Sequence, residues 1–334
     1  LNVYDDRGVL PRWLAPSEVN CMPGTLIEAV FADAVVKRLL SERNARRALD
    51  AMVKNSQFLP EGNKIARKCT EEYTSLGYVP YTECNESVNE TLDSAYGDFC
   101  ISTVADALGE KKIAEKYFRS SRNYKNLFDP CTGFMRARDG KGYFRKEKFD
   151  CFAWGGDYTE GSAWQNSFSV PHDYAGLAEL YGGKDAFLRK IDDLFNSLPL
   201  YSVGGYGREI HEMTEMAATD LGQCAISNQP SFHLPFLYAE FGEKERSRSI
   251  VEKIIQTCFS AEDDGFPGDE DNGTMACWYL FAVLGLYPTC PGKDTFIVTG
   301  TLADSARLCI NGKTIDLKER LKGCERIKYG ELIK

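Results

Sequence analysis

Residues 156–165, GDYTEGSAWQ, place one carboxylic acid, Glu160, within a run of glycine, tyrosine and tryptophan. The run is too irregular for a helix face and too polar for a strand core, so it predicts a loop that presents one acid against aromatic rings. Burial against an apolar ring disfavours the ionised form of a carboxyl group, and a carboxyl group that stays protonated can act as a general acid. The alternative is an ordinary exposed loop glutamate, which needs no special role.

A second group of acids, Asp269, Glu270 and Asp271, lies in the segment GDEDNG directly before an apolar helical stretch. Three carboxylates this close repel one another, so a cation, a metal ion or a shared proton is expected if they are buried. The alternative is that one carboxylate only caps the following helix, at Asp271 or Asn272. The segment is not an EF-hand, because its glycine stands one position early and no glutamate closes the loop at the twelfth position.

The segment REIHEMTEM contains His211, Glu212 and Glu215. His211 and Glu215 are separated by one helical turn and would share one face of a helix. This face is either the edge of a metal site or a solvated, salt-bridged surface, and the spacing leaves both open.

Two further segments contain histidine. In ISNQPSFH, the amides of Asn228 and Gln229 and a proline stand at a predicted helix start together with His233. In SVPHDY, His172 is expected only to cap the next helix. The three histidines of the chain have unrelated spacing, which does not support a zinc site.

Apolar residues recur at helical spacing through most of the chain and predict paired helices joined by short breaks. The predicted helices cover residues 25–40, 45–56, 90–108, 111–124, 172–182, 184–198, 231–242, 244–259 and 274–287. Long glycine- and proline-rich loops between the pairs contain the acids and histidines, and only residues 294–319 alternate like strands, around an Asn-Gly turn.

These elements predict an all-α fold, an α/α toroid of the six-hairpin type whose loops meet at one mouth. We expect a toroid domain over residues 1–293 and a short C-terminal β segment over residues 294–334. A helical solenoid with binding loops is the alternative, but no fixed repeat period supports it.

Length and composition exclude several classes of protein. The chain has 334 residues, 43% of them hydrophobic, which is enough to form a core. Its formal charge of −9 and the lack of a basic block with interleaved aromatics argue against a nucleic-acid partner. No run approaches 18 apolar residues, so no membrane span is expected. The first residues, LNVYDDRGVLPRW, show no signal peptide, but the chain starts with leucine and is compatible with a mature form or a piece of a longer protein.

The twelve cysteines show neither a C-x-x-C motif nor a Cys/His cluster, so zinc by the usual spacings is unsupported. Cys100 and Cys258 lie on apolar helical stripes, where a cysteine behaves as a small buried hydrophobe. Sequons at Asn85, Asn89 and Asn272 permit glycosylation in a secreted protein but occur often by chance.

The chain is similar to the catalytic domain of glycoside hydrolase family 92 in a collinear series of segments over nearly its whole length: VLPRWL, ETLDSAYGDFCI, NYKNLFDPCTGFMRARDGKG, DYTEGSAWQ, VPHDYAGLAELYGGKDAFLRKIDDLF, IHEM, NQPSFHLPFLY and GDEDNGTMACWYLFAVLGLYPTCPGKDTFIV. Members of that family are calcium-dependent, inverting exo-α-mannosidases. A series of rare segments in the correct order is more specific than any one of them.

The resemblance implies that Glu160 is the general acid and Asp271 the general base, with Asp269 beside it, and that Trp164 and Gln165 contact substrate. An inverting glycosidase needs one carboxyl group that protonates the leaving oxygen and one carboxylate that activates water on the opposite face of the sugar. The two groups are then expected to lie about 6.5–9.5 Å apart.

The pair His211 and Glu212 resembles the pair that family members cleaving α-1,2 bonds use on the leaving-group sugar. The resemblance further implies a calcium ion that binds the sugar's 2- and 3-hydroxyls. Its oxygen ligands are expected at Glu215, Asn228 and Gln229, together with the acidic GDEDNG loop.

The chain also departs from the family pattern. The N-terminal β-sandwich of family members and an early S-L-W-D-T-like segment, whose aspartate holds the mannose, have no counterpart in it. Gly24-Thr25 stands where many members have Gly-Asp, and Phe232 stands where a polar residue is common. We therefore expect an incomplete toroid, with the missing N-terminal β-sandwich region as a partner.

The resemblance implies an exo-acting, inverting α-mannosidase that removes terminal α-mannosides, with α-1,2 linkages expected, from N-glycans or mannans. A secreted, periplasmic, secretory-pathway or lysosomal location is expected on the same ground. The main alternative is a catalytically incomplete or non-catalytic mannose-binding fragment of such an enzyme. A third possibility is an unrelated helical scaffold that binds a protein partner through its loops.

Overall fold

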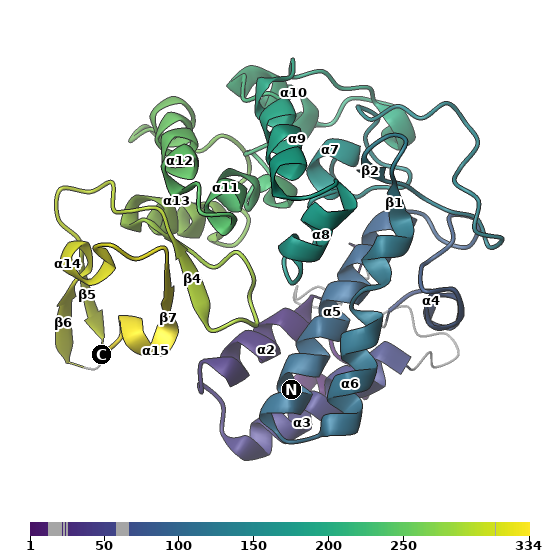
Figure 1. The fold of residues 1–334 in the computed structure, drawn as a ribbon, viewed down its shortest axis with the longest axis horizontal. Helices are drawn as coiled ribbons and strands as arrows, with labels where there is room; N and C mark the ends of the chain where they lie inside the picture. The colour runs from purple at the N-terminus through teal and green to yellow at the C-terminus, as the bar shows by residue number, and fades with distance from the viewer. Residues whose placement is uncertain (13–21, 23, 25, 58–66, 311) are drawn as a thin grey trace. The chain divides into compact units, whose positions relative to one another are not determined.

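The structure is a computed structural model that describes residues 1–12, 22, 24, 26–57, 67–310 and 312–334 (Figure 1). The chain forms two compact units. The first comprises Leu1–Leu180, Val203–Gly207 and Pro291–Lys293, and the second comprises Tyr181–Ser202, Arg208–Cys290 and Asp294–Lys334. The predicted domain boundary between residues 293 and 294 stays a prediction.

In its described residues, the first unit contains helices, connecting loops and one short antiparallel pair of strands. Its elements are α1 (Asn2–Arg7), α2 (Ile27–Val36), α3 (Glu42–Gln57), α4 (Thr70–Leu76), α5 (Ser87–Ala107), α6 (Lys111–Ser120), η1 (Asn123–Leu127), β1 (Phe128–Asp129), β2 (Phe134–Met135), α7 (Ala163–Asn166), α8 (Tyr174–Leu180) and η2 (Gly204–Tyr206).

Helix α5 is the centre of this unit, and α2, α3 and α6 pack against it (Figure 1). Residues on most faces of α5 are buried, and Leu92, Ile101 and Val104 have no exposed surface. A helix that is buried all round is typical of the core of a large helical protein. Because α5 is enclosed in this way, its first turn is a fixed support for the loops that contact it.

Charged side chains in this core occur in pairs. Arg67, 3% exposed, lies 2.6 Å from Asp98 and 3.6 Å from Glu28, whose side chains are almost completely buried. A buried charge is tolerated only when it is paired, so these contacts tie the segment before α4 to α5 and α2.

The second unit combines helices with short strands. Its elements are α9 (Lys184–Asn196), α10 (His211–Thr219), η3 (Gln229–Ser231), η4 (Leu234–Phe236), α11 (Leu237–Glu240), α12 (Lys244–Cys258), α13 (Thr274–Leu284), β3 (Leu286–Tyr287), β4 (Thr295–Val298), β5 (Arg307–Ile310), β6 (Lys313–Asp316), α14 (Leu317–Leu321), β7 (Arg326–Lys328) and α15 (Tyr329–Leu332).

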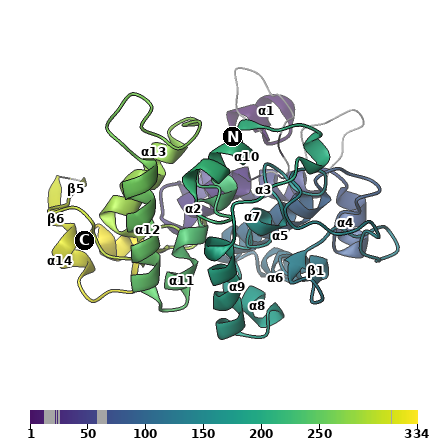
Figure 2. The same cartoon turned by 90° about the horizontal axis from the view of Figure 1, so that it is seen from above.

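Helix α12 packs against α11 (Figures 1 and 2). It also packs against the η4 turn. Directly after α12, the ring of Phe259 stacks on Trp278 of α13 with ring centroids 5.6 Å apart. These contacts hold α13, and with it the acidic loop that precedes it, against the body of the unit.

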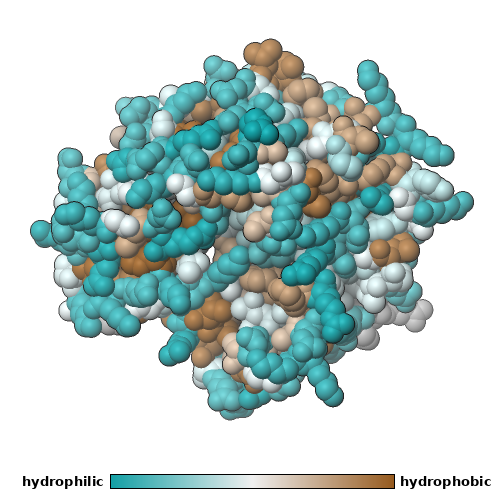
Figure 3. Space-filling model, viewed as in Figure 1, coloured by the Kyte–Doolittle hydropathy of each residue, from teal (hydrophilic) through white to brown (hydrophobic). Residues whose placement is uncertain are grey.

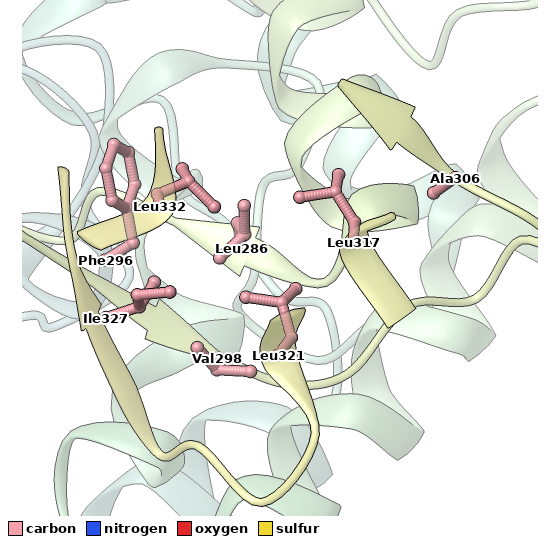
Figure 4. Packing of buried hydrophobic residues seen from close by; sticks show 8 residues of the cluster. All are labelled: Leu286, Phe296, Val298, Ala306, Leu317, Leu321, Ile327 and Leu332. Carbon is pink, nitrogen blue, oxygen red and sulfur yellow. The ribbon is translucent and has the colours of Figure 1, made fainter. Parts of the chain in front are cut away.

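The C-terminal strands have their own apolar cluster (Figure 4). Three antiparallel strands pair in the order β3-β4-β7, and β5 pairs with β6 as a hairpin in which Ile310 is opposite Lys313. The strands, α14, α15 and the residue before β5 bury apolar side chains against one another: Leu286, Phe296, Val298, Ala306, Leu317, Leu321, Ile327 and Leu332. The predicted all-α class with a short C-terminal β segment is confirmed; the asparagine of the predicted Asn-Gly turn lies outside the described residues.

The helix predicted over residues 274–287 ends at Leu284, and Leu286 and Tyr287 form β3 instead. The other predicted helices are present, several with shorter ends, except over residues 231–242, where a continuous helix is wrong. Two 3₁₀ turns and one short helix stand there, because Pro235 lacks the backbone N–H that an α-helix interior requires. The first residue of the helix predicted at 25–40, and Cys21, lie outside the described residues.

The molecular face in Figure 3 is largely hydrophilic, with apolar residues in small separate patches, in keeping with a composition that is 27% charged. Within the part of the chain that the structure describes, no helix combines the length and the apolar character that crossing a membrane requires.

Candidate active site

Glu160 lies in a tight loop of the first unit, as the sequence predicts. Its backbone has a positive φ of 44°, which is uncommon outside glycine, and its side chain is half-buried. The Gly155 N–H donates to the Gly161 carbonyl at 3.1 Å and closes the loop. The Glu160 N–H donates to the Tyr206 hydroxyl at 3.0 Å. The acid therefore projects from a backbone that is fixed on both sides.

Tyr206 reaches Glu160 because glycines in both segments, Gly155 and Gly156 in one and Gly204 and Gly205 in the other, allow the two backbones to touch. Gly155 and Gly156 lie against η2, where the Gly205 N–H donates to the Trp154 carbonyl at 2.7 Å. A Cβ on Gly205 would lie 2.2 Å from the Gly156 nitrogen, closer than real atoms approach. Any side chain there would separate the two segments and move Tyr206 away from the acid loop.

The first turn of α5 supports the same loop from another direction. Just before and within this turn, the Glu86 and Val88 N–H groups donate to the carbonyls of Gly156 and Asp157 at 2.7 and 3.1 Å. The free N–H groups at a helix start need acceptors, and this loop supplies two of them.

Asn89, also in this turn, connects the acid loop to α7. Its Oδ1 accepts from the Thr159 N–H at 3.0 Å, and its Nδ2 donates to Asn166 Oδ1 at 2.7 Å. Because Asn89 is 7% exposed and both of its amide atoms are used, its sequon is not a glycosylation site in the folded protein.

Trp164 and Gln165 occupy α7, directly after the acid loop. Gln165 is fully buried, and its Oε1 accepts from the Ser162 N–H at 2.7 Å in a capping box that starts the helix. Trp164 is 6% exposed and meets the ring of Phe134 edge-on at 4.8 Å. The structure gives both side chains packing and capping roles, and their predicted contact with substrate stays a prediction.

A pocket of about 380 Å³ lies beside the loop, within the first unit. It is lined by loop residues including Gly155, Asp157 and Tyr158, and by Arg136 and Arg145. Arg145 donates two hydrogen bonds to Asp157, at 2.7 and 3.1 Å, so both of these charges are compensated.

The second unit contains the other candidates. His211 begins α10, and its imidazole lies among three carboxylates: Nδ1 is 2.9 Å from Glu215 Oε1, and Nε2 is 3.3 Å from Glu212 Oε1 and 3.9 Å from Asp269 Oδ2. The His211 side chain is 54% exposed. The hydrogen bond to Glu215, reinforced by the charges of Glu212 and Asp269, raises the pKa of His211 above its ordinary value, although partial burial opposes this. The His211–Glu215 pair predicted from the sequence is therefore present.

The acidic GDEDNG loop divides its three acids between two roles. Glu270 accepts from the Gly273 N–H at 2.5 Å and from the Ala276 N–H at 3.0 Å, and thereby caps α13. The predicted cap at Asp271 or Asn272 is therefore wrong, because the capping carboxylate is that of Glu270, one or two positions earlier. Asp269 and Asp271 are exposed and are available for chemistry.

Asp271 is positioned by the NQP segment. Gln229 Nε2 donates to Asp271 Oδ2 at 2.7 Å, and the backbone at Asp271 has a positive φ of 48°. The Asn228 side chain accepts from the Gln229 N–H at 2.9 Å and caps the η3 turn. The structure therefore brings together the predicted base and one predicted metal ligand.

Carboxylate oxygens of the second unit are of the kind that binds a hard cation such as calcium. Glu212 Oε2 and Glu215 Oε2 are buried and have no hydrogen-bond partner among the described residues. A Cβ on Gly268 would come within 3.0 Å of that Glu215 oxygen, so the glycine leaves space beside it. Calcium takes carboxylate, amide and carbonyl oxygens together. Within the described ranges, however, no three His, Cys, Asp or Glu side chains by themselves form a metal site.

His172 is a structural histidine rather than a helix cap. It is 7% exposed, its Nε2 is 2.8 Å from the Ser121 carbonyl, and its ring stacks on Tyr96. Asp173 caps α8 instead, because its Oδ1 accepts from the Gly176 N–H at 3.0 Å. Burial lowers the pKa of His172 to about 4.

The sequence did not single out Tyr206 or Asn89, which hold the acid loop. Tyr206 lies in a glycine-rich loop that is recognisable as functional by its length, but nothing in the local sequence indicates its partner 46 residues away. Asn89 stands out in the sequence only as part of a sequon. The general acid and general base candidates belong to different units, and their separation stays a prediction.

Comparison with known proteins shows the family of the chain. A model of the glycosyl hydrolase family 92 catalytic domain matches residues 1–329. A curated relative, an uncharacterized secreted glycosidase of Arthroderma benhamiae, is 26% identical over 353 residues, which cover 95% of this chain and 42% of that protein.

Solved structures of the same family are similar to the chain. A family 92 inverting mannosidase of Bacteroides thetaiotaomicron is 34% identical with a TM-score of 0.86, over 99% of this chain and 47% of its own. A second α-mannosidase of that organism is 28% identical with a TM-score of 0.83, over 99% of this chain and 44% of its own. This likeness confirms the predicted α/α toroid fold class.

The chain spans less than half the length of each of these three relatives. The family match itself covers all but the last five residues of the chain. The chain therefore belongs to glycosyl hydrolase family 92 through its catalytic domain.

Proposed function

We propose that the protein acts as an exo-α-mannosidase that hydrolyses terminal α-mannosides with inversion. The observation that supports this most is the Glu160 loop: a single acid on a strained, fixed backbone, beside a pocket, in a chain similar to an inverting mannosidase over 99% of its length. Strained backbone that the surrounding structure holds in place occurs preferentially at functional sites.

The chemistry assigns one step to each unit. Glu160 protonates the departing glycosidic oxygen, and Asp271 takes a proton from the water that attacks the opposite face of the sugar. The Gln229 amide fixes the carboxylate of Asp271, so that one orientation is favoured before substrate arrives. Asp269, 79% exposed, is free to orient the same water.

The linkage preference that we propose is α-1,2, through His211 and Glu212. His211 is exposed, and the hydrogen bond to Glu215 together with the charges of Glu212 and Asp269 raises its pKa, which shifts the equilibrium toward the protonated imidazole. Glu215 holds the Nδ1 side of the ring at 2.9 Å, and Nε2, at 3.3 Å from Glu212 and 3.9 Å from Asp269, is the donor that we propose for a hydroxyl of the leaving-group sugar.

We also propose calcium as the cofactor, held by Glu215 with oxygens of Asn228 and Gln229. When bound, calcium supplies a positive charge that attracts sugar hydroxyls. The protein is expected to lose activity on addition of a chelator and to recover it with calcium, while its far-ultraviolet circular dichroism stays constant. A collapse of the dichroism together with the activity would make the metal structural instead.

The proposed setting is extracellular or within the secretory pathway, with N-glycans or mannans as substrates, in line with the secreted relative. Because the chain spans less than half of its relatives, the N-terminal β-sandwich region is proposed as a partner that completes the site. The second candidate function is mannose binding without catalysis. The short span of the chain relative to these relatives favours it as well.

One experiment separates these two functions. Mannose release is measured from α-1,2-, α-1,3- and α-1,6-linked mannobioses by the chain alone and after addition of the N-terminal half of a family relative. Release that is fastest for the α-1,2 substrate, in either mixture, supports the proposal. Mannose binding without release in both mixtures would support the binding fragment instead.

A further inference from the structure

One side of the Glu160 loop faces the pocket of about 380 Å³ instead of close-packed side chains. Loop residues including Gly155 and Asp157 line this pocket, and Arg145 lines it as well. Arg145 donates to both carboxylate oxygens of Asp157, from Nε at 3.1 Å and from Nη2 at 2.7 Å. This bidentate pair is a direct side-chain link to the loop on the side of the pocket, where tight packing cannot hold it.

Arg145 is itself held in position by the segments around it. Its guanidinium lies over the ring of Tyr81, with its Cζ 3.9 Å from the ring centroid. The Arg145 N–H donates to the Ala137 carbonyl at 3.0 Å, and the Tyr81 N–H donates to the Arg138 carbonyl at 3.0 Å. A planar guanidinium that rests on an aromatic ring loses little further freedom when it forms two parallel hydrogen bonds. Arg145 is therefore a preorganised partner for Asp157.

Asp157 transmits this support toward the acid, because Glu160 follows it by three positions in the chain. The Asp157 carbonyl accepts from the Val88 N–H at 3.1 Å, and the hydroxyl of the next residue, Tyr158, donates to the Met135 carbonyl at 2.6 Å. The Glu160 backbone has a positive φ of 44°, and such a conformation persists only where the surroundings hold it. The stretch directly before this residue is thus held through side chain and main chain together.

We propose that Arg145 is a positioning residue for the general acid and acts through Asp157. The inference rests on the proposed function, in which Glu160 protonates the leaving oxygen. A displacement of a catalytic group by about 1 Å can reduce a rate about 10²-fold, so a loop held loosely at Asp157 would impair proton transfer. An ordinary ion pair with this partial exposure would contribute little to stability and would not favour one kind of substrate.

Kinetics of Arg145→Ala on two substrates separates the positioning role from a merely structural one, in the mixture that shows mannose release. On a mannobiose, whose leaving group needs a proton, kcat should fall about 10–100-fold. On an activated aryl mannoside it should fall much less, and KM for both substrates should stay constant. An equal loss of kcat on both substrates, or a change confined to KM, would overturn the proposal.

Arg138→Ala is the matched control. The Arg138 guanidinium lies over the ring of Phe144 at 4.1 Å, and its Nη1 donates to the Gly142 carbonyl at 3.2 Å. Because neither contact involves the Glu160 loop, both rates should stay close to those of the wild type. Arg145→Lys keeps the charge but not the two parallel hydrogen bonds, and it should recover part of the lost rate. A loss on mannobiose in Arg138→Ala as large as that in Arg145→Ala would contradict the specific role of Arg145.

Hydrogen exchange tests the same link without any activity. The N–H groups of Gly155, Tyr158, Thr159 and Glu160 are hydrogen-bonded within the loop or to its supports. A peptide that covers residues 155–160 should exchange faster in Arg145→Ala than in the wild type, and at the wild-type rate in Arg138→Ala. Unchanged exchange in Arg145→Ala would overturn the proposal even in an active mannosidase. Faster exchange in a protein that releases no mannose would support the link but contradict the proposed function, so the two failures are distinguishable.

Discussion

At the scale of single residues, the account depends on where hydrogen bonds place two carboxylates. Glu160 is held through its own N–H by Tyr206, and Asp271 is held through its side chain by Gln229. The first arrangement fixes the backbone from which the carboxyl group projects. The second orients the carboxylate itself, as a base requires.

Replacing Glu160 tests the acid role directly. Glu160→Gln should reduce hydrolysis of mannosides with poor leaving groups by about 10²–10⁴-fold, because the leaving oxygen then receives no proton. Activated aryl mannosides, whose leaving groups need no proton, should lose much less. Rates on both substrate types are compared with those of Glu179→Gln, at an exposed glutamate of α8 that has no proposed role. An equal loss on both substrates would remove Glu160 from the acid role.

His172 makes stability depend on pH in a definite direction. Burial lowers its pKa to about 4, from an ordinary value of 6.5, so the folded state keeps it neutral while the unfolded state binds a proton. Above about pH 6.5, His172 causes no loss of unfolding free energy. As the pH falls to about 4, the unfolding free energy decreases by up to about 3 kcal/mol because the unfolded state binds this proton.

This dependence is measured by urea unfolding at several pH values between 7 and 4 for the wild type and His172→Gln. The glutamine variant keeps a hydrogen-bond donor but does not titrate, so its curve should be flatter. Parallel curves would contradict the assignment to His172.

At the scale of elements, periodicity predicted the long helices because their apolar stripes are local in sequence. The helix predicted at 184–198 became α9 (Lys184–Asn196), and that at 244–259 became α12 (Lys244–Cys258). The continuous helix over 231–242 failed at Pro235, a signal that was present in the sequence. The support of the Glu160 loop by Asn89 and Tyr206 could not be predicted, because it depends on contacts 46 to 70 residues apart.

The ionic contacts that join α5 to its neighbours are testable at this scale. Arg67→Ala leaves the buried carboxylates of Asp98 and Glu28 without their partner, which should cost about 3–5 kcal/mol of unfolding free energy. Arg46→Ala, which breaks exposed pairs with Glu42 and Glu110, should change it by at most about 1 kcal/mol. Urea unfolding of both variants decides this, and similar small losses would mean that the core tolerates the unpaired acids.

At the scale of the whole molecule, the proposed reaction requires both units. Glu160 belongs to the first unit and Asp271 to the second, so neither unit alone contains the acid and the base. The resemblance to family 92 could be seen in the sequence because its motifs are collinear, whereas the two-unit division depends on contacts that the sequence order does not show. The chain spans less than half of each relative. For this reason we include completion of the site by a further region in the proposal.

The stereochemistry of the first product tests the central claim most directly. Hydrolysis of an α-mannoside is followed by proton NMR at early times, before the released sugar mutarotates, in the mixture that shows mannose release. If Glu160 is the acid and Asp271 directs water to the opposite face of the sugar, β-mannose should appear first and α-mannose only later. Initial α-mannose would contradict the inverting mechanism and, with it, the roles assigned to both carboxylates.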